Sequence, residues 1–330
     1  MARASLIRRS RNGCKDSSAD LWVLLIYNSP KAQENVQNMR SPGQRKGNTI
    51  LITGSSGRIG SAIAASLRND YTIIGIDISP GPYTTHTTDI QSSEVIHLIK
   101  KADIVVHTAA LHAPHVGVYD DKNFWDVNVR GTENLLNACL KHKVPRFIFT
   151  SSTSIYGHAM GRPQEAVWVT EELQPQPRDI YDETKLAAED LCRQAANNGS
   201  LSCLCLRISR CFPEEERLMI IYRLYRGIDI DDVVLAHKLA LTSDTKGFDI
   251  LNISSQTPFN VYELNELYHH ADRVISKYYP HAINIFQDRG WSLPTTIDRV
   301  YVIEKASRLL RFRPLCNFRE SLTSAEKIKS

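Results

Sequence analysis

With 330 residues, of which 42% are hydrophobic and 23% charged, the chain has the composition of a soluble globular protein and room for one large or two unequal domains. Its formal net charge of +4 comes from the first 47 residues, because residues 48–330 carry 31 basic and 33 acidic side chains. A slightly acidic body gives nucleic-acid binding no electrostatic support, so we expect no nucleic-acid partner.

Residues 1–47 predict a disordered extension, or a translation start placed too early. They are Arg-rich and contain an apolar run from Leu21 to Tyr27 that is too short to cross a bilayer. Asp20 before that run does not suit a secretory signal. We therefore expect no membrane partner. The seven cysteines, odd in number and without metal-type pairing, favour reduced thiols and a cytoplasmic location.

The first strong pattern is a strand, a glycine turn and a helix in "TILITGSSGRIGSAIAASLRND". Glycine allows a tight turn and a close approach of the backbone to a pyrophosphate at the helix N-terminus. The next strand ends at Asp77, seventeen residues after Gly60, where an acid meets the adenine ribose in dinucleotide-binding folds. A carboxylate there repels a 2′-phosphate, which favours NAD over NADP, although Arg58 in the turn would tolerate one. Asp77 as an ordinary turn residue is the alternative.

Strands and helices continue to alternate along the chain. Further buried strands are predicted at 102–110, 145–153, 201–209 and 248–254, and helices at 124–143, about 179–197, after 230 with Asp231 or Asp232 as its cap, and from Asn260 onward. This order predicts an α/β fold with a doubly wound parallel sheet of the Rossmann type. We expect an NAD-binding domain from residues 48–207 plus 229–253, and a small C-terminal substrate-binding lobe from residues 208–228 plus 254–330.

A tyrosine stands four residues before a lysine at three places: Tyr181/Lys185, Tyr27/Lys31 and Tyr301/Lys305. The spacing alone does not identify a site, because residues i and i+4 share a face in any helix. Only Tyr181 and Lys185 lie on a predicted helix that follows a strand ending in a Ser/Thr cluster. Pro30 interrupts the first of the other two pairs, and the last has no such strand before it. The sequence therefore favours "IYDETK".

Five motifs then occur in order: "TGSSGRIG", "HTAA" (107–110), "NVRGT" (128–132), "FTSSTSIYG" (149–157) and "YDETK". Together they resemble the extended short-chain dehydrogenase/reductase superfamily, NAD-dependent epimerase/dehydratase type, over residues 48 to about 240. The resemblance implies a homodimer formed through the helices at 120–142 and 179–197. It implies a catalytic set of Ser152, Tyr181 and Lys185, with Ser151 and Thr153 as near alternatives to Ser152. The implied NAD contacts are Gly54, Ser56, Gly57, Arg58, Ile59, Gly60, Asp77, Asp89, Ile90, Ala109, Ala110, Asn128, Tyr181 and Lys185.

The chemistry accounts for these residue types. Hydride transfer at a carbinol carbon requires an acid/base on the hydroxyl oxygen. A free tyrosine is too weak an acid, so we expect the Lys185 ammonium and the positive nicotinamide ring to bring the pKa of Tyr181 nearer neutrality. Lys185 is also expected to hold the nicotinamide ribose. Asp89 and Ile90 are expected to flank the adenine or simply to start the next helix, and Asn128 to hydrogen-bond backbone near the catalytic strand.

The substrate side departs from the family pattern. Similar nucleotide-sugar enzymes carry a long insertion after "LRIS", whereas here about fifteen residues separate Ser209 from Tyr225. The short stretch is closer to relatives that oxidise a free sugar or uronic acid, so we expect a dehydrogenase of a small sugar or sugar acid. The alternatives are a nucleotide-sugar epimerase or dehydratase with tightly held NAD, and a non-catalytic NAD-binding sensor. Candidate substrate contacts are His112, Thr153, Arg210 and Arg226, with Arg299 as a weaker one.

The histidines of "HTAALHAPH" lack the further ligands that a metal site needs, so no metal is expected. His107 is expected to end its strand as a packed, hydrogen-bonded residue. Cys203 and Cys205 alternate in an apolar run and are expected to pack in the core.

Overall fold

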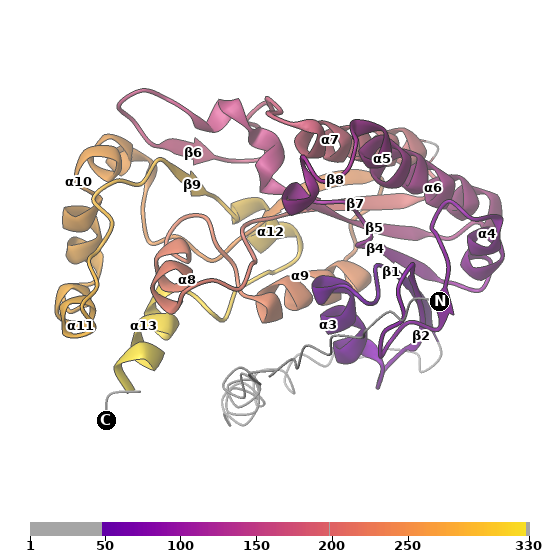
Figure 1. Cartoon of the computed structure of the whole chain (residues 1–330), viewed down its shortest axis with the longest axis horizontal. Coiled ribbons are helices and arrows are strands. Elements are labelled where there is room, and N and C mark those ends of the chain that lie inside the picture. The colour runs from indigo at the N-terminus through magenta and orange to yellow at the C-terminus, as the bar shows by residue number, and fades with distance from the viewer. Residues whose placement is uncertain (1–47, 198, 328–330) are drawn as a thin grey trace, which may run out of the picture. The chain divides into compact units, whose positions relative to one another are not determined.

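A wholly parallel seven-stranded sheet forms the centre of the molecule (Figure 1). The computed structural model describes residues 48–197 and 199–327, so the predictions for residues 1–47 and for Tyr27/Lys31 lie outside the described residues. The strand order is β3-β2-β1-β4-β5-β7-β8, which reverses between β1 and β4. The predicted doubly wound sheet is thus confirmed. Its strands are β1 (Thr49–Thr53), β2 (Thr72–Asp77), β3 (His86–Thr87), β4 (Ile104–His107), β5 (Arg146–Ser152), β7 (Ser202–Ile208) and β8 (Phe248–Ile253).

Helices cover both faces of the sheet (Figure 1). On one face lie α4 (Ser93–Ile99), α5 (Asp121–Phe124), the π-helical segment η2 (Trp125–Arg130), α6 (Gly131–His142) and α7 (Ile180–Ala196). On the other lie α3 (Arg58–Leu67), α9 (Ile230–Thr242) and α12 (Glu304–Leu309). Alternate residues of each strand feed the two layers, as Leu51 packs with the first group and Ile50 and Ile52 with the second.

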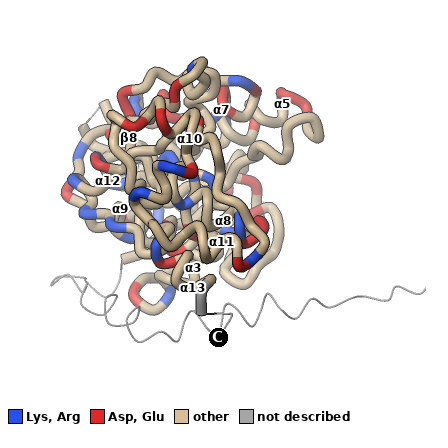
Figure 2. Tube along the Cα trace, turned by 90° about the vertical axis from the view of Figure 1, so that its left-hand side faces the viewer, with Lys and Arg blue, Asp and Glu red and all other residues tan. Residues whose placement is uncertain are grey.

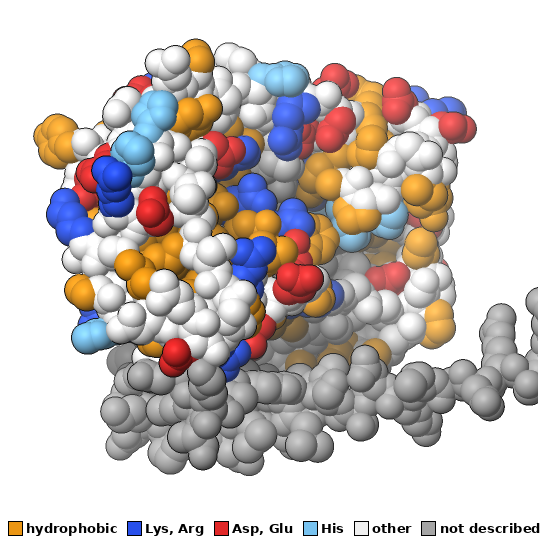
Figure 3. Space-filling view, turned by 60° about the vertical axis from the view of Figure 1, so that its left-hand side comes forward, with side chains coloured by type: hydrophobic (Ala, Val, Ile, Leu, Met, Phe, Trp, Pro, Cys, Tyr) orange, Lys and Arg blue, Asp and Glu red, His pale blue; other side chains and the backbone are white. Residues whose placement is uncertain are grey.

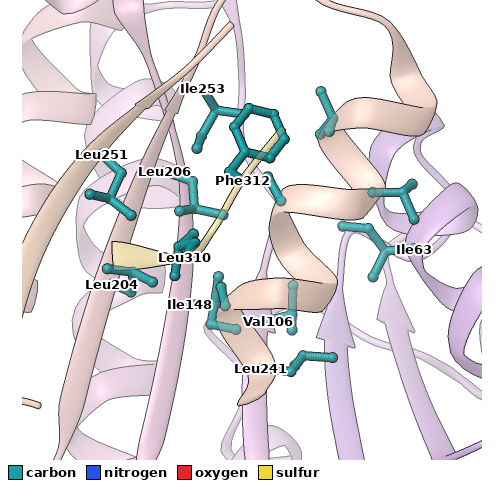
Figure 4. Packing of buried hydrophobic residues seen from close by; sticks show 14 of the residues in the cluster. Ile63, Val106, Ile148, Leu204, Leu206, Leu241, Leu251, Ile253, Leu310 and Phe312 are labelled. Atoms are coloured by element: carbon teal, nitrogen blue, oxygen red, sulfur yellow. The ribbon is translucent and has the colours of Figure 1, made fainter. Parts of the chain in front are cut away.

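The apolar layer on the face covered by α3, α9 and α12 joins segments that are far apart in the sequence. Figure 4 shows Ile63 of α3 and Leu241 of α9 on the side of the central strands' side chains, with Leu310 beside Leu206 and Phe312 beside Ile253. Cys203 and Cys205 are buried in the opposite layer, as expected.

Short polar side chains fix where helices begin. Asp179 caps α7 by accepting from the Asp182 amide at 2.9 Å. Asn260 begins the predicted helix, through the single turn η5 (Val261–Glu263) and then α10 (Leu264–Tyr278). The predicted cap of α9 is wrong by two or three residues. Asp229 is the cap, because its backbone is extended and its carboxylate accepts from the Asp231 amide, whereas Asp231 and Asp232 already lie in the first turn.

A smaller lobe has its own core. Its strands β6 (Val167–Val169) and β9 (Arg299–Tyr301) pair in parallel, and around them lie α8 (Glu216–Tyr222), α10, α11 (Ala282–Asp288) and α13 (Phe318–Lys327) (Figure 1). Tyr301 ends β9, while Lys305 lies on α12 and pairs with Asp249. Tyr301 and Lys305 therefore do not share a helix.

Acidic and basic positions are interleaved along the chain on the face that Figure 2 presents, in line with the near-neutral charge of residues 48–330. Within the described part of the chain, no helix is long and apolar enough to cross a membrane.

Candidate active site

The hydroxyl of Tyr181 meets that of Ser152 where β5 gives way to the turn η3 (Thr153–Tyr156). Ser152 ends the strand, and its Oγ also lies 2.9 Å from the Oγ of Ser154 and accepts from the Ser154 amide at 3.1 Å. Tyr181 stands in the first turn of α7 and is 8% exposed. Hydrogen bonding with Ser152 lowers the pKa of Tyr181, which places the two side chains next to each other. Two hydroxyl groups from different elements therefore lie near each other at the carboxyl end of the sheet.

Lys185 follows one turn later on the same face of α7 and is 4% exposed. Its Nζ donates to the carbonyl of Thr150 at 2.9 Å and lies 4.5 Å from the centroid of the Phe149 ring. Burial lowers the pKa of Lys185 to about 8, and the Glu189 carboxylate is the largest influence that opposes this. The ammonium form therefore persists at neutral pH.

The sequence predicted a lowered pKa for Tyr181, and this prediction is wrong when only the groups of the protein itself act on the phenol. Burial raises the pKa of Tyr181 to about 12, and the hydrogen bond with Ser152 only partly opposes it, while Asp182 and Asp179 raise it further. Desolvation of the phenolate thus outweighs what the protein supplies. Any activation of this phenol must come from a positive charge bound beside it.

The glycine turn leaves room for a pyrophosphate. Gly54 has φ of 71°, and a Cβ there would lie 2.7 Å from the Ala109 amide nitrogen, while a Cβ on Gly60 would collide with the Gly54 carbonyl. Helix α3 begins without a side-chain cap at Gly57 and without an acid in its first turn. Its first N–H groups are free of a protein side-chain acceptor, which is the arrangement that binds phosphate oxygens.

Asp77, at the end of β2, lies against this turn. Its carboxylate accepts from the Ser56 amide and from the Ser79 amide, each at 3.0 Å. Two oxygens offer about four acceptor sites, so the carboxylate has capacity left for ribose hydroxyls. Arg58 points elsewhere, because its guanidinium donates to the Cys211 carbonyl in the segment after β7. The residues present therefore fit a dinucleotide, and Arg58 does not neutralise Asp77.

Other residues predicted to contact the cofactor lie in the glycine turn, after β4 and before α4. Asp89 accepts from the Gln91 amide at 2.8 Å, and Ile90 is buried in the core with its carbonyl bonded to Asn134. Neither starts α4, because Ser92 is the cap of that helix. Ser56 lies in the turn and Ile59 in the first turn of α3. Ala109 and Ala110 follow β4, with the Ala109 amide beside Gly54.

Two buried polar residues brace the site from behind. His107 ends β4, with Nδ1 at 2.7 Å from the Thr53 Oγ1 and Nε2 at 2.9 Å from the Thr132 Oγ1. Burial, with help from the Lys185 ammonium, lowers the pKa of His107 to about 3, so the ring is neutral. This is the packed, hydrogen-bonded role that the sequence predicted. No group of three or more His, Cys, Asp or Glu in the described ranges converges to hold a metal ion.

Asn128 is the second brace. It lies in η2, accepts from the Leu111 amide at 2.8 Å and donates to the Leu111 carbonyl at 2.9 Å and to Thr184 at 3.1 Å. Its backbone partner is therefore the loop after β4 and not the catalytic strand. Through Thr184 it also reaches the helix that carries Tyr181 and Lys185. A π-helical turn often marks such a functional position.

The predicted substrate residues divide into two sets. Thr153 is 3% exposed and its hydroxyl donates to the Ile208 carbonyl at 3.4 Å, so it faces the sheet. His112 lies in the loop after β4, next to the single turn η1 (Ala113–His115), and its amide donates to the His115 Nδ1 at 3.1 Å. Burial lowers the pKa of His112, as do His115 and the Lys185 ammonium, which places the ring within reach of the lysine's charge.

Arg210 and Arg226 are neighbours after β7, where a backbone bridge joins Arg210 to Gly227. Arg210 binds the Glu214 carboxylate through two nitrogens at 2.8 and 2.5 Å. Arg226 stacks on Tyr222 at 4.2 Å and has a buried Nε without a partner. Both predicted arginines thus lie beside one pocket, whose lining includes Arg58, Arg210, Phe212, Glu214, Tyr222, Arg223 and Asp229. Arg299, the first residue of β9, instead pairs with Asp298 just before the strand and lies near Met160 of η4 (His158–Met160).

The face of Figure 3 is hollowed, with Lys and Arg side chains along its inner wall and histidines on a rim. Sequence reasoning missed Arg223 in the pocket and a buried pair, Glu189 and Arg207, behind Lys185. The signal for Glu189 was present, since Tyr181, Lys185 and Glu189 recur at every fourth position of one helix.

Comparisons with known proteins agree with these observations. A family model described as the NAD dependent epimerase/dehydratase family matches residues 50–222. An uncharacterized UDP-glucose epimerase of Bacillus subtilis (strain 168) is 27% identical over 201 residues, covering 54% of this chain and 61% of the relative. UDP-glucose 4-epimerase 2 of Oryza sativa subsp. japonica is 30% identical over 167 residues, covering 44% and 40%. The chain thus spans about three fifths or less of these relatives' length.

Solved structures share the fold. MoeE5 in complex with UDP-glucuronic acid and NAD matches with a TM-score of 0.62 at 23% identity, covering 86% of this chain and 100% of that one. UDP-glucuronic acid 4-epimerase from Bacillus cereus, in complex with UDP-glucuronic acid and NAD, gives 0.62 at 23% identity, covering 85% and 99%.

Proposed function

Because the chain belongs to the NAD-dependent epimerase/dehydratase family, we propose that it is an enzyme that holds NAD and acts on a carbinol carbon of a nucleotide sugar. The observation that carries the proposal is the meeting of the Tyr181 and Ser152 hydroxyls, with Lys185 one turn along α7. Two hydroxyls that converge from a strand end and a helix can hold one substrate oxygen between them. A sensor that only binds NAD has no use for this cluster.

The cofactor site follows from the glycine turn. Gly54, Gly57 and Gly60 let the turn fold tightly, and α3 begins without a side-chain cap, so its first N–H groups can bind phosphate oxygens. Asp77 offers free acceptor positions to ribose hydroxyls. We assign NAD in preference to NADP, since Asp77 would repel a 2′-phosphate and Arg58 is engaged with Cys211. Bound NAD supplies the hydride acceptor and, when oxidised, the positive charge that favours the Tyr181 phenolate.

The protein's own groups then handle the proton. Ser152 donates a hydrogen bond to the substrate oxygen and holds it against Tyr181. The Tyr181 phenolate takes the hydroxyl proton as the carbinol carbon loses its hydride, and returns it when the hydride comes back. Lys185, an ammonium below about pH 8, stays one turn away and stabilises the phenolate. Return of the hydride to the opposite face of the carbon would invert it, which is epimerisation.

The pocket supports an anionic substrate. Arg58, Arg210 and Arg223 line it, and Arg226 lies alongside. Within the described residues, the Nε atoms of Arg223 and Arg226 are buried without a partner, as is the Oγ of Ser209 at the end of β7. Such orphaned donors cost free energy unless a ligand's acceptors meet them. A diphosphate or a carboxylate provides those acceptors, and the sugar-nucleotide relatives favour the first.

A dehydrogenase of a small sugar acid, which the sequence favoured, is the second candidate. Its support is the short connection between Ile208 of β7 and Ile230 of α9, which carries only α8. That connection leaves few residues to enclose a nucleotide.

One assay separates the candidates. The purified full chain is incubated with NAD and, in turn, UDP-glucose, UDP-glucuronic acid, free uronates and aldoses, while NADH absorbance and sugar products are followed. Isomerised nucleotide sugar without net NADH supports the proposal. Net NADH from a free uronate or aldose supports the second candidate. Tyr181→Phe is expected to keep NAD binding and to lose turnover by at least a hundredfold; unchanged turnover contradicts the role of Tyr181.

We make three further proposals about assembly, location and domain organisation. We propose a homodimer formed through α5–α6 and α7, where the Trp125 side chain is 41% exposed. Light scattering of the wild type and of Trp125→Glu, which should disrupt the interface, checks this assembly. We propose a cytoplasmic location, which the six free cysteines among the described residues support. We also keep the division into an NAD-binding domain and a substrate lobe as a proposal, to be checked by limited proteolysis.

A further inference from the structure

A bidentate ion pair is buried behind the site. Glu189 of α7 is fully buried and Arg207 of β7 is 2% exposed. The Arg207 Nη2 lies 2.6 Å from the Glu189 Oε2, and its Nε lies 3.0 Å from the Oε1. The Ser151 hydroxyl donates to the same Oε1 at 2.6 Å. One carboxylate therefore joins α7, β5 and β7.

The pair is continuous with the proposed catalytic set. Tyr181, Lys185 and Glu189 are one turn apart from one another on a single face of α7. Ser151, which Glu189 holds, precedes Ser152 in β5. On the far side, the Arg207 guanidinium lies 4.9 Å from the centroid of the Tyr156 ring. Glu189 thus fixes the position of α7, which carries Tyr181 and Lys185, on β5 and β7 of the sheet.

Stability alone explains this pair poorly. Two charges removed from water lose hydration, and apolar replacements of a buried ion pair are often as stable or more so. The position next to Lys185 offers another reason. The charged or titratable groups that bear on Lys185 are Glu189 and Cys192 of α7, Cys205 of β7, His107 of β4 and His112 of the following loop. Among these, Glu189 is the sole carboxylate.

We propose that Glu189 is a positioning residue that keeps Lys185 charged, and that Arg207 limits this effect by neutralising Glu189 from the other side. The relevance to catalysis rests on the proposed function, in which the ammonium of Lys185 stabilises the Tyr181 phenolate. The electrostatic claim itself needs neither cofactor nor substrate. Burial of the lysine favours loss of its proton, and the carboxylate one turn away opposes that loss.

Two substitutions are expected to shift the titration midpoint of Lys185 in opposite directions. Glu189→Gln removes the negative charge and leaves Arg207 unmatched near Lys185, so Lys185 loses its proton at lower pH. Arg207→Met leaves Glu189 unmatched, so Lys185 keeps its proton to higher pH. A merely structural pair would not give opposite shifts, because both substitutions would loosen the same contact.

The test follows Lys185 directly by NMR of the full chain with lysines isotope-labelled at Cε. The Lys185 signal is the one that Lys185→Arg removes. We expect its titration midpoint to fall by about one pH unit in Glu189→Gln and to rise by a similar amount in Arg207→Met. The variant with both substitutions carries no unpaired charge, and its midpoint is expected to lie below that of Arg207→Met. If Glu189→Gln does not fold, the difference between these two variants still measures the effect of the Glu189 charge on Lys185.

The outcomes separate the two proposals. Shifts in the same direction, or a midpoint within error of wild type in Arg207→Met, overturn the role of Glu189. Glu263→Gln is the matched control, because Glu263 pairs with Lys277 at 2.7 Å in the lobe, and it should leave the Lys185 signal in place. Opposite shifts in a chain that neither binds NAD nor turns over a sugar would uphold the electrostatic claim and reject the proposed function.

Discussion

The carboxylate of Asp77 accepts a hydrogen bond from the backbone amide of Ser56 at 3.0 Å. The acid that ends β2 is therefore held against the glycine turn, at a fixed place beside the start of α3. A negative charge fixed there discriminates between dinucleotides, because it attracts hydroxyl donors and repels a phosphate.

Asp77→Asn keeps the shape and removes the charge. We expect the ratio of NADP affinity to NAD affinity to rise about tenfold or more, since like charges no longer meet at the ribose. Isothermal titration with both cofactors measures the ratio. Asp70→Asn, which makes the same change before the opposite end of β2, is the control. An unaltered ratio in Asp77→Asn would reject the ribose contact.

Gly60→Ala tests the tightness of the turn. The new methyl group would meet the Gly54 carbonyl, which is backbone and has no rotamer to escape into. We expect a loss of NAD affinity of at least tenfold together with a lower melting temperature. Gly161→Ala is a matched control, because its methyl would lie at an ordinary 3.5 Å from the His158 carbonyl. Equal NAD affinities and melting temperatures of the two variants would show that the turn can accommodate a methyl group at residue 60.

Asn128 ties the loop after β4 to η2 through both polar groups of Leu111. Asn128→Asp retains the acceptor but sets a carboxylate oxygen against the Leu111 carbonyl, so we expect a loss of about 1–3 kcal/mol in the free energy of unfolding. Asn134→Asp, which replaces a residue with one bond to the Ile90 carbonyl, should cost less. Urea unfolding measures both, and the reverse order would contradict this account.

Lys185 makes stability depend on pH. Its pKa falls from 10.5 to about 8 on burial, so between these values the unfolded chain binds more protons than the folded protein, and stability rises with pH. Relative to Lys185→Met, the wild type should gain about 3 kcal/mol, fully present above about pH 10.5 and lost as pH falls through 8. Urea unfolding of both across that window checks the sign, with Lys141→Met removing an exposed lysine as the control. A flat difference curve would show that Lys185 is hydrated.

The sheet, the order of its strands and helices along the chain, and the helix that carries Tyr181 and Lys185 were predictable, because local sequence patterns report them. A strand that is buried on both faces reads as a continuous apolar run, and the switch to helical periodicity after Gly60 marks the turn. Choosing Tyr181 over Tyr301 needed only the strand and its hydroxyl cluster before the helix.

The pairing of charges was not predictable, because it depends on which segments fold together. Arg58 bonds to Cys211, and Glu189 bonds to Arg207 across two elements. Nothing in the spacing of either pair indicates contact. The pKa of Tyr181 was misjudged for the same reason, since its burial is a property of the assembled site and outweighs the hydrogen bond with Ser152.

The bond from Arg58 to the Cys211 carbonyl spans 153 residues of sequence. A guanidinium from the turn that begins α3 is thus shared with the segment that leads into α8. A ligand that draws this group toward itself must first take it from Cys211, and a displacement of the segment must stretch it. Ligand binding at the glycine turn and the position of the segment before α8 are then coupled through the Arg58 side chain. By linkage, a ligand that favours one position of that segment is itself bound more tightly when the segment takes that position.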